Sequence, residues 1–135
     1  MLRISRNTLV LGCVLAALAV LLGAFAAHGL KNYVSTDQIQ TFQTGVRYQF
    51  YHAFGLICLG LISLHTGTDH FKWSIISISL GVLFFSGSLY VIATTPIHQI
   101  STKLLGPITP IGGLFMIGGW ILAIYQLLRI PITKA

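Results

Sequence analysis

The stretch GVRYQFYHAFGL, Gly45 to Leu56, begins the second of four long apolar segments in this chain. It carries an arginine, a histidine, a glutamine and two tyrosines, and such groups are costly in hydrocarbon unless each finds a partner or reaches the interface. The uncharged run Tyr48 to Leu64 is 17 residues long, which is close to the minimum for a membrane span. We therefore expect Arg47 to extend to the headgroups, and the stretch to lie where a helix enters the bilayer.

Composition places the chain among membrane proteins. Its 135 residues are 55% hydrophobic and 7% charged, whereas about a quarter of the residues of a soluble domain are charged. We predict one integral membrane domain over residues 1–135, an all-α, antiparallel bundle of four transmembrane helices. The helices are expected at about residues 8–27, 45–64, 73–95 and 108–128.

The loop before the second span predicts a short amphipathic helix at about residues 36–45. Ser35, Thr36 and Asp37 are candidate N-caps, and Asp37 with Gln40 has the spacing of a capping box. Apolar residues then recur at helical spacing, namely Ile39, Phe42, Val46 and Phe50. We expect this interfacial helix to run or bend into the second span.

The basic residues indicate orientation. With four spans, five lysines and arginines fall on the side of both termini and three on the other, so both termini are expected in the cytoplasm. Arg3, Arg6 and the small-residue stretch Ala24 to Ala26 also resemble a signal peptide, but the apolar run is longer than such peptides need, which favours an uncleaved first helix. The dispersed positive charges do not form a basic patch, so no nucleic-acid partner is expected.

Small residues mark the expected helix contacts. In the first span they are spaced four and three apart, a seam that lets another helix approach closely: Gly12, Ala16, Ala19, Gly23 and Ala26. The third span has small residues on two faces, which predicts a neighbour on each side. In the stretch GPITPIGG, Gly106 to Gly113, both prolines are expected in the first turn of the last helix, followed by a stripe of Gly112, Gly119 and Ala123.

The candidate site residues are polar groups expected near the outer surface: His28, Arg47, Tyr48, Gln49, His52, Ser86 and Tyr90. One interpretation is an interhelical hydrogen-bond cluster in which His52 meets Tyr90, Ser86 or a backbone carbonyl. The others are a ligand or substrate site, or a metal or haem site using His28, His52 and His98. The histidine spacing is a weak signal for metal, and we predict neither a metal nor another cofactor.

The motifs GAFAAHGL (Gly23 to Leu30), FQTGVRYQFYHAFGL (Phe42 to Leu56), LFFSGSLY (Leu83 to Tyr90) and GPITPIGGLFMIGGW (Gly106 to Trp120) together resemble a known family. It is the domain of unknown function 423 family, the UPF0382 small inner-membrane proteins. The resemblance implies a multi-pass plasma-membrane protein with four helices and supplies no activity.

No catalytic residues are predicted. The spans hold no carboxylate for proton-coupled transport, and Ser86 with Gly87 is not a nucleophile elbow. We expect a non-enzymatic inner-membrane protein that acts through contacts with helices, membrane lipids or partner proteins, as a homo-oligomer or within a larger complex. The alternatives are a small transporter or lipid- or small-molecule-binding protein using Arg47, Tyr48, His52 and Tyr90, and a haem or metal protein.

Overall fold

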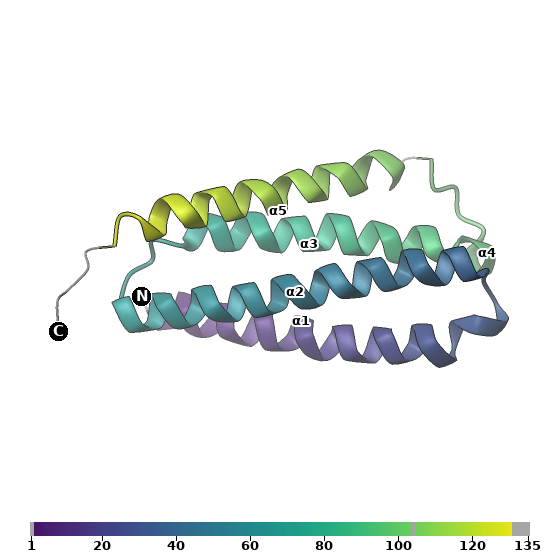
Figure 1. Ribbon diagram of the computed structural model, residues 1–135, viewed down its shortest axis with the longest axis horizontal. Coiled ribbons are helices and arrows are strands. Elements are labelled where there is room, and N and C mark those ends of the chain that lie inside the picture. Colours follow the sequence, from purple (N-terminus) through teal and green to yellow (C-terminus); the bar gives the residue numbers. More distant parts are fainter. Residues whose placement is uncertain (1, 104, 131–135) are drawn as a thin grey trace.

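The computed structural model describes residues 2–103 and 105–130, and these residues are helical apart from short connections (Figure 1). The all-α class is therefore confirmed for this part of the chain. The elements are α1 (Leu2–His28), the 3-10 helix η1 (Leu30–Asn32), α2 (Thr36–Thr66), α3 (Lys72–Ala93), α4 (Thr95–His98) and α5 (Leu105–Leu127). In Figure 1, each of the long helices α2, α3 and α5 runs back along the direction of the long helix before it.

Three of the long helices, α1, α3 and α5, are long and apolar enough to cross a membrane. The longest helix, α2, has 31 residues but carries Gln49, His52 and three nearby tyrosine or arginine side chains close to its middle. These groups lower its mean hydropathy, so length and composition alone do not identify α2 as a span.

The start of α2 differs from the sequence-based expectation. Its N-cap is Ser35, whose hydroxyl accepts from the amide of Gln38 at 3.3 Å, while the Gln38 side chain accepts from the Ser35 amide at 2.9 Å. The expected capping box of Asp37 and Gln40 was therefore wrong by two residues. The predicted interfacial helix at 36–45 and the second span form one unbroken helix, which ends where Gly67 adopts a left-handed conformation (φ +63°).

The predicted small-residue seam of α1 is confirmed as the surface that packs on α2. A Cβ atom at Gly12 would lie 2.6 Å from Cγ1 of Ile57 and 2.9 Å from the carbonyl oxygen of Ala53. Ala19 and Ala26, further along the seam, are fully buried. The absence of larger side chains lets the two helix backbones approach closely, which is what holds helices together in lipid.

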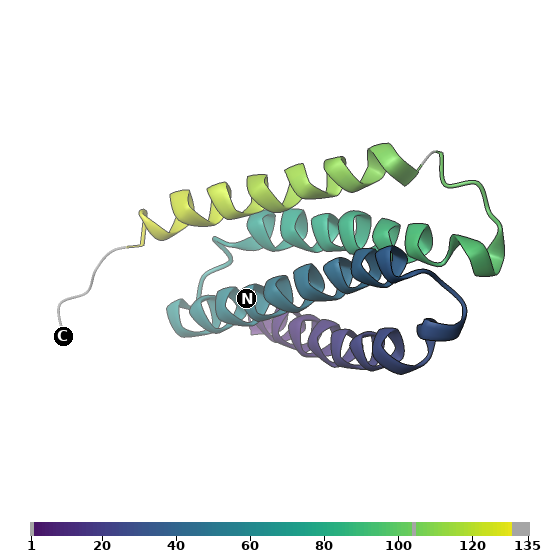
Figure 2. The same ribbon diagram turned by 45° about the vertical axis from the view of Figure 1, so that its right-hand side comes forward.

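As predicted, α3 has neighbours on two sides, α2 and α5 (Figure 2). Polar side chains connect α3 to α5 along the seam: Ser74 Oγ donates to Oε1 of Gln126 at 2.6 Å, Ser77 Oγ donates to the carbonyl of Phe115 at 2.7 Å, and Ser88 Oγ and Thr109 Oγ1 are 2.6 Å apart. Gly112, Gly119 and Ala123 of α5 are buried, as expected. Of the two prolines, Pro107 lies in the first turn, but Pro110 lies inside the helix, because α5 starts at Leu105.

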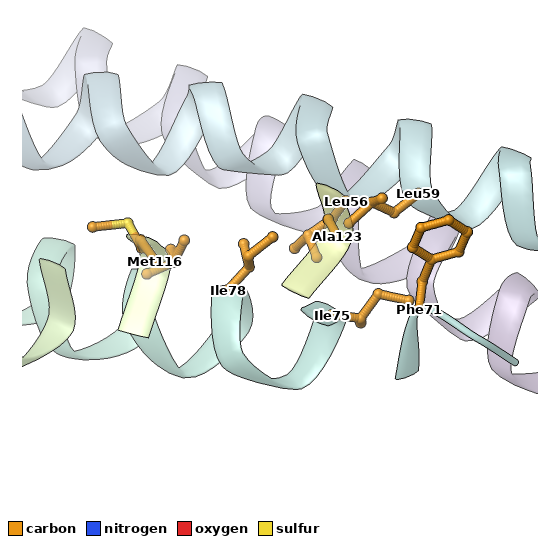
Figure 3. Close-up of a cluster of buried hydrophobic side chains, with 8 residues drawn as sticks. Leu56, Leu59, Phe71, Ile75, Ile78, Met116 and Ala123 are labelled. Atoms are coloured by element: carbon orange, nitrogen blue, oxygen red, sulfur yellow. The ribbon is translucent and has the colours of Figure 1, made fainter. Parts of the chain in front are cut away.

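The apolar core joins α2, α3 and α5 (Figure 3). Its buried members are Leu56, Leu59, Phe71, Ile75, Ile78, Val82, Met116 and Ala123. In Figure 3, Leu59 of α2 lies beside the ring of Phe71 at the start of α3, and Leu56 lies beside Ala123 of α5. α2 is therefore an inner helix, like α3, and packs against α1 on one side and against α3 on the other.

We predict that Gly112→Ala lowers the stability of the folded protein. A Cβ at Gly112 would collide with the backbone of Phe84 and Phe85, which has no flexible end that could move away. Overpacking of this kind costs about 1–3 kcal/mol. Gly118→Ala on the same helix is the matched control, since a Cβ there meets nothing within 4 Å. Thermal unfolding in detergent should show a lower midpoint for Gly112→Ala alone; equal midpoints for the two variants would contradict the packing.

Candidate functional site

The side-chain amide of Gln49 connects three helices. It lies on α2 with 5% of its surface exposed, and its Nε2 donates to the carbonyl oxygen of Leu15 on α1 at 2.8 Å. Its Oε1 accepts from the hydroxyl of Tyr90 on α3, also at 2.8 Å. Both ends of a buried amide are thereby satisfied, which removes the cost of placing it in an apolar environment.

Tyr90 reaches Gln49 because α2 carries a glycine at position 45. A Cβ at Gly45 would lie 2.8 Å from Cε1 of Tyr90, so any other residue would displace the ring. The ring also packs against Phe42, with the two ring centroids 4.7 Å apart. One turn of α2 therefore supplies the surface for the ring, and the next turn supplies the acceptor for its hydroxyl.

His52 belongs to a different face of α2. Its Nδ1 donates to the carbonyl oxygen of Tyr48 in its own helix at 2.7 Å. Its ring lies near Tyr48 and Trp120, with centroid distances of 6.2 Å to each. Trp120 of α5 fits against α2 because a Cβ at Gly55 would lie only 2.6 Å from the indole. The expected contact of His52 with Tyr90 or Ser86 is replaced by a backbone carbonyl, the third of the predicted partners.

Arg47 and His28 lie outside the buried cluster. Arg47 is exposed, and its Nη2 donates to Oγ1 of Thr44 at 3.2 Å, one turn earlier on the same helix. His28 is exposed at the end of α1. It lies at about the same height as Phe42, because Phe25, one turn before His28 on α1, has its ring centroid 6.3 Å from that of Phe42. His52 follows Phe42 by ten residues of α2, or about 15 Å along the helix axis. The two histidines therefore do not converge.

The remaining candidates have separate surroundings. Ser86 is buried, and its hydroxyl has no hydrogen-bond partner among the described residues. His98 uses both ring nitrogens locally, with Nε2 3.0 Å from the Val91 carbonyl and Nδ1 accepting from the Ile100 amide at 3.0 Å. Within the described part of the chain, no three histidine, cysteine or acidic side chains gather in a way that could hold a metal ion.

A groove runs between α1 and α3, over the surface of α2. It has two halves that share Leu11 and Ser79. One half has a volume of about 430 Å³ and contains Gln49 and Tyr90, and its walls are Leu11, Leu15, Leu18 and Leu22 of α1 with Ser79, Val82, Leu83 and Gly87 of α3. The other half, about 420 Å³, continues toward the start of both helices and includes Asn7 and Lys72. Two of the predicted site residues thus border an apolar groove on the side of the helix bundle.

Comparison with known proteins identifies the family. The family described as "Protein of unknown function (DUF423)" matches residues 22–113, more than half of the chain. The chain belongs to the DUF423 family. The predicted resemblance is therefore confirmed.

Three relatives extend the similarity over almost the whole chain. The UPF0382 membrane protein of Staphylococcus haemolyticus is 43% identical over 116 residues, covering 86% of this chain and 90% of that protein. YwdK, a UPF0382 membrane protein of Bacillus subtilis, is 39% identical and covers 86% and 91%, respectively. The UPF0382 inner membrane protein YgdD of Escherichia coli is 31% identical over 126 residues, covering 93% and 92%. No solved structure matches. The chain is thus a membrane protein of a family without an assigned activity.

Sequence reasoning missed the groove of this DUF423 protein. The α1 wall is a row of leucines spaced four, three and four apart, which runs beside the small-residue seam on the same helix. That row was visible in the sequence, but it looks the same whether it faces lipid, a helix or an opening. Gly87 and Lys72 were also missed, because their significance depends on their position opposite α1.

We predict that Tyr90→Phe destabilises the protein by about 0.6–1.7 kcal/mol, the range measured for interhelical hydrogen bonds in membranes. The loss arises because Oε1 of Gln49 would keep its buried position without its donor. Tyr51→Phe is the matched control, since Tyr51 is 63% exposed.

Unfolding free energies for Tyr90→Phe, Gln49→Leu and the double variant should be non-additive. Additive effects would contradict a direct bond between the two side chains.

Proposed function

We propose that this DUF423 protein is a four-span, antiparallel inner-membrane protein that acts through contact within the membrane at the α1–α3 groove, and that it is not an enzyme. The groove carries the proposal, because it is a concave surface bordered by the polar bridge that joins three helices. Lipid, a partner helix and a second copy of the chain are the classes of molecule that such a surface can contact.

Packing supports α2 as the fourth span. It lies against both α1 and α3, which are each long and apolar enough to cross a membrane. A helix held between two spans shares their environment, and the 31 residues of α2 reach about 46 Å at 1.5 Å per residue. Its polar residues do not argue against this placement, since Gln49 and His52 are buried and hydrogen-bonded.

The arrangement of polar groups supports a structural role for them. Tyr48 packs against Phe85 of α3 and His52 lies near Trp120 of α5. Gln49 bonds to α1 and to Tyr90, and Arg47 is exposed. These residues therefore do not converge on a common cavity, as a transport site using them would require. We infer that they hold the helices in register and leave the groove as the functional surface.

A topology experiment tests the span count and orientation. Green fluorescent protein fused after Ala135 should fluoresce in bacterial cells, because both termini are proposed to be cytoplasmic. Alkaline phosphatase inserted after Asn32, in the connection between α1 and α2, should be active on the other side of the membrane. Three spans would place the two termini on opposite sides, so an active phosphatase fusion at the C-terminus combined with a cytoplasmic N-terminus would contradict the proposal.

A crosslinking experiment tests the groove. A photoreactive amino acid at Leu18, which lines the groove and is 44% exposed, should yield a discrete adduct in cells. The same group at Ile121, which is 60% exposed on α5 outside the groove, should yield only scattered lipid products. Gly87→Leu should abolish the discrete adduct, since a Cβ at Gly87 meets no protein atom within 4 Å and Gly87 lines the groove.

Gly118→Leu is the control for that substitution, because Gly118 is an equally open position on α5. It should leave the adduct at Leu18 unchanged. The same scattered products from Leu18 and Ile121, without any discrete adduct, would refute the groove as a contact surface.

A further inference from the structure

The half of the groove that lies toward the start of α1 and α3 has its one charged side chain, Lys72, at one end, and the hydroxyls of Thr8 and Ser79 in its lining donate to carbonyls of their own helices. Its walls are apolar side chains such as Ile4, Leu11, Ile75 and Leu80, and its volume is about 420 Å³. Asn7 and Lys72 lie at the end where α3 begins. An amphiphile with one polar head and a hydrocarbon tail has the same distribution of polarity.

Lys72 is suited to meet an anion at the membrane surface. It is exposed, and its Nζ lies 5.6 Å from the ring centroid of Trp73, which is itself 64% exposed. Exposed tryptophans concentrate at the depth of the lipid headgroups. The residues lining this half of the groove include neither Asp37 nor Asp69, so no carboxylate there opposes an anion. Asp69 meets Lys72 through its backbone, accepting from the Lys72 amide at 3.1 Å.

From these observations we infer that the α1–α3 groove binds an anionic phospholipid of the cytoplasmic leaflet. The phosphate lies at Lys72 and Asn7, and one acyl chain follows the groove past Leu11 and Ser79. This inference rests on the proposed function, since it names the ligand of the same contact surface.

The dimensions of the groove favour an acyl chain over a helix. From Ile4 to Leu22 the groove follows about 27 Å of α1, and a helix about 10 Å in diameter would need roughly 2,100 Å³ over that length. The empty space in the two halves of the groove, counting the part that is open to the surroundings, is about 820 and 860 Å³. A helix would therefore protrude from the groove, whereas a single flexible chain can enter between the walls.

Native mass spectrometry of the full-length protein provides the test. The purified protein is mixed in detergent with equal amounts of dioleoyl phosphatidylglycerol and dioleoyl phosphatidylcholine, which differ only in their headgroups. We expect the phosphatidylglycerol adduct to exceed the phosphatidylcholine adduct about fivefold, which corresponds to about 1 kcal/mol for one lysine near an anionic lipid. Lys72→Gln should remove this preference. Lys103→Gln, which loses the same charge at the other end of the molecule, should keep it.

A second variant tests the tail. Ser79 stands where the two halves of the groove meet, and its hydroxyl donates to the carbonyl of Ile75 in its own helix at 2.7 Å. Ser79→Leu therefore breaks no contact between helices but fills the groove, and it should reduce retention of both lipids severalfold. Gly118→Leu should not. If Ser79→Leu fails to fold, judged by thermal unfolding, Leu11→Trp blocks the same point from the α1 side.

The inference is overturned if Lys72→Gln retains the phosphatidylglycerol preference, or if the folded blocking variant retains both lipids as the unmodified protein does. Its failure can be separated from that of the proposed function. A discrete adduct at Leu18 that proves to be a second copy or another protein, with no lipid preference, refutes the lipid site and leaves the contact surface intact. Absence of any discrete adduct refutes both.

Discussion

The rest of the structure depends on one buried amide. Gln49 is 5% exposed, so each end of its side chain needs a partner, and the two partners come from different helices. The carbonyl of Leu15 and the hydroxyl of Tyr90 can both reach it only if α1 and α3 lie on two sides of α2 at a particular height. Gly12 and Gly45 make this possible, since larger residues would hold α1 and the Tyr90 ring further away. A single polar residue thus fixes the register of three helices.

The groove is a consequence of this arrangement. α1 and α3 each pack against α2 and leave a space between them, with Gln49 at its base. On the other side of α3, Ser74, Ser77 and Ser88 bond directly to α5, and an opening of about 470 Å³ lies along that seam, bordered by Ser77 and Gln126. The described residues therefore include a pair of helices joined by side-chain hydrogen bonds, α3 and α5, and a groove between α1 and α3 that no direct bond between those two helices crosses. Function is proposed at the second of these because a ligand can enter there without breaking a bond between helices.

Much of the fold could be predicted from local spacing. Small residues at intervals of three and four predicted that α1 and α5 would each bury a close-packing face, and Gly12 and Gly119 confirm it. What spacing does not specify is the partner of each face. Gln49 and His52 are three residues apart, so they lie only about 60° apart around α2, and a small rotation decides which of them meets Tyr90. Similarly, Ser35 and Asp37 are both good N-caps, and the choice depends on which residue adopts the extended backbone that Ser35 has.

There is a physical reason why hydropathy does not identify α2 as a span. A hydropathy scale assigns each side chain the cost of facing lipid, and α2 holds more costly side chains than its neighbours. In the folded chain, α1, α3 and Trp120 of α5 cover Gln49 and His52, whereas Arg47, Tyr48 and Tyr51 stay exposed. Large apolar side chains face outward on α1 and α5, as with Val20 at 62% and Leu114 at 68% exposure. The two buried polar groups each have a partner, because Gln49 bonds to α1 and α3 and His52 bonds to the Tyr48 carbonyl of its own helix. A helix that packs between neighbours can hold such groups because the neighbours cover them and, for Gln49, supply the hydrogen-bond partners.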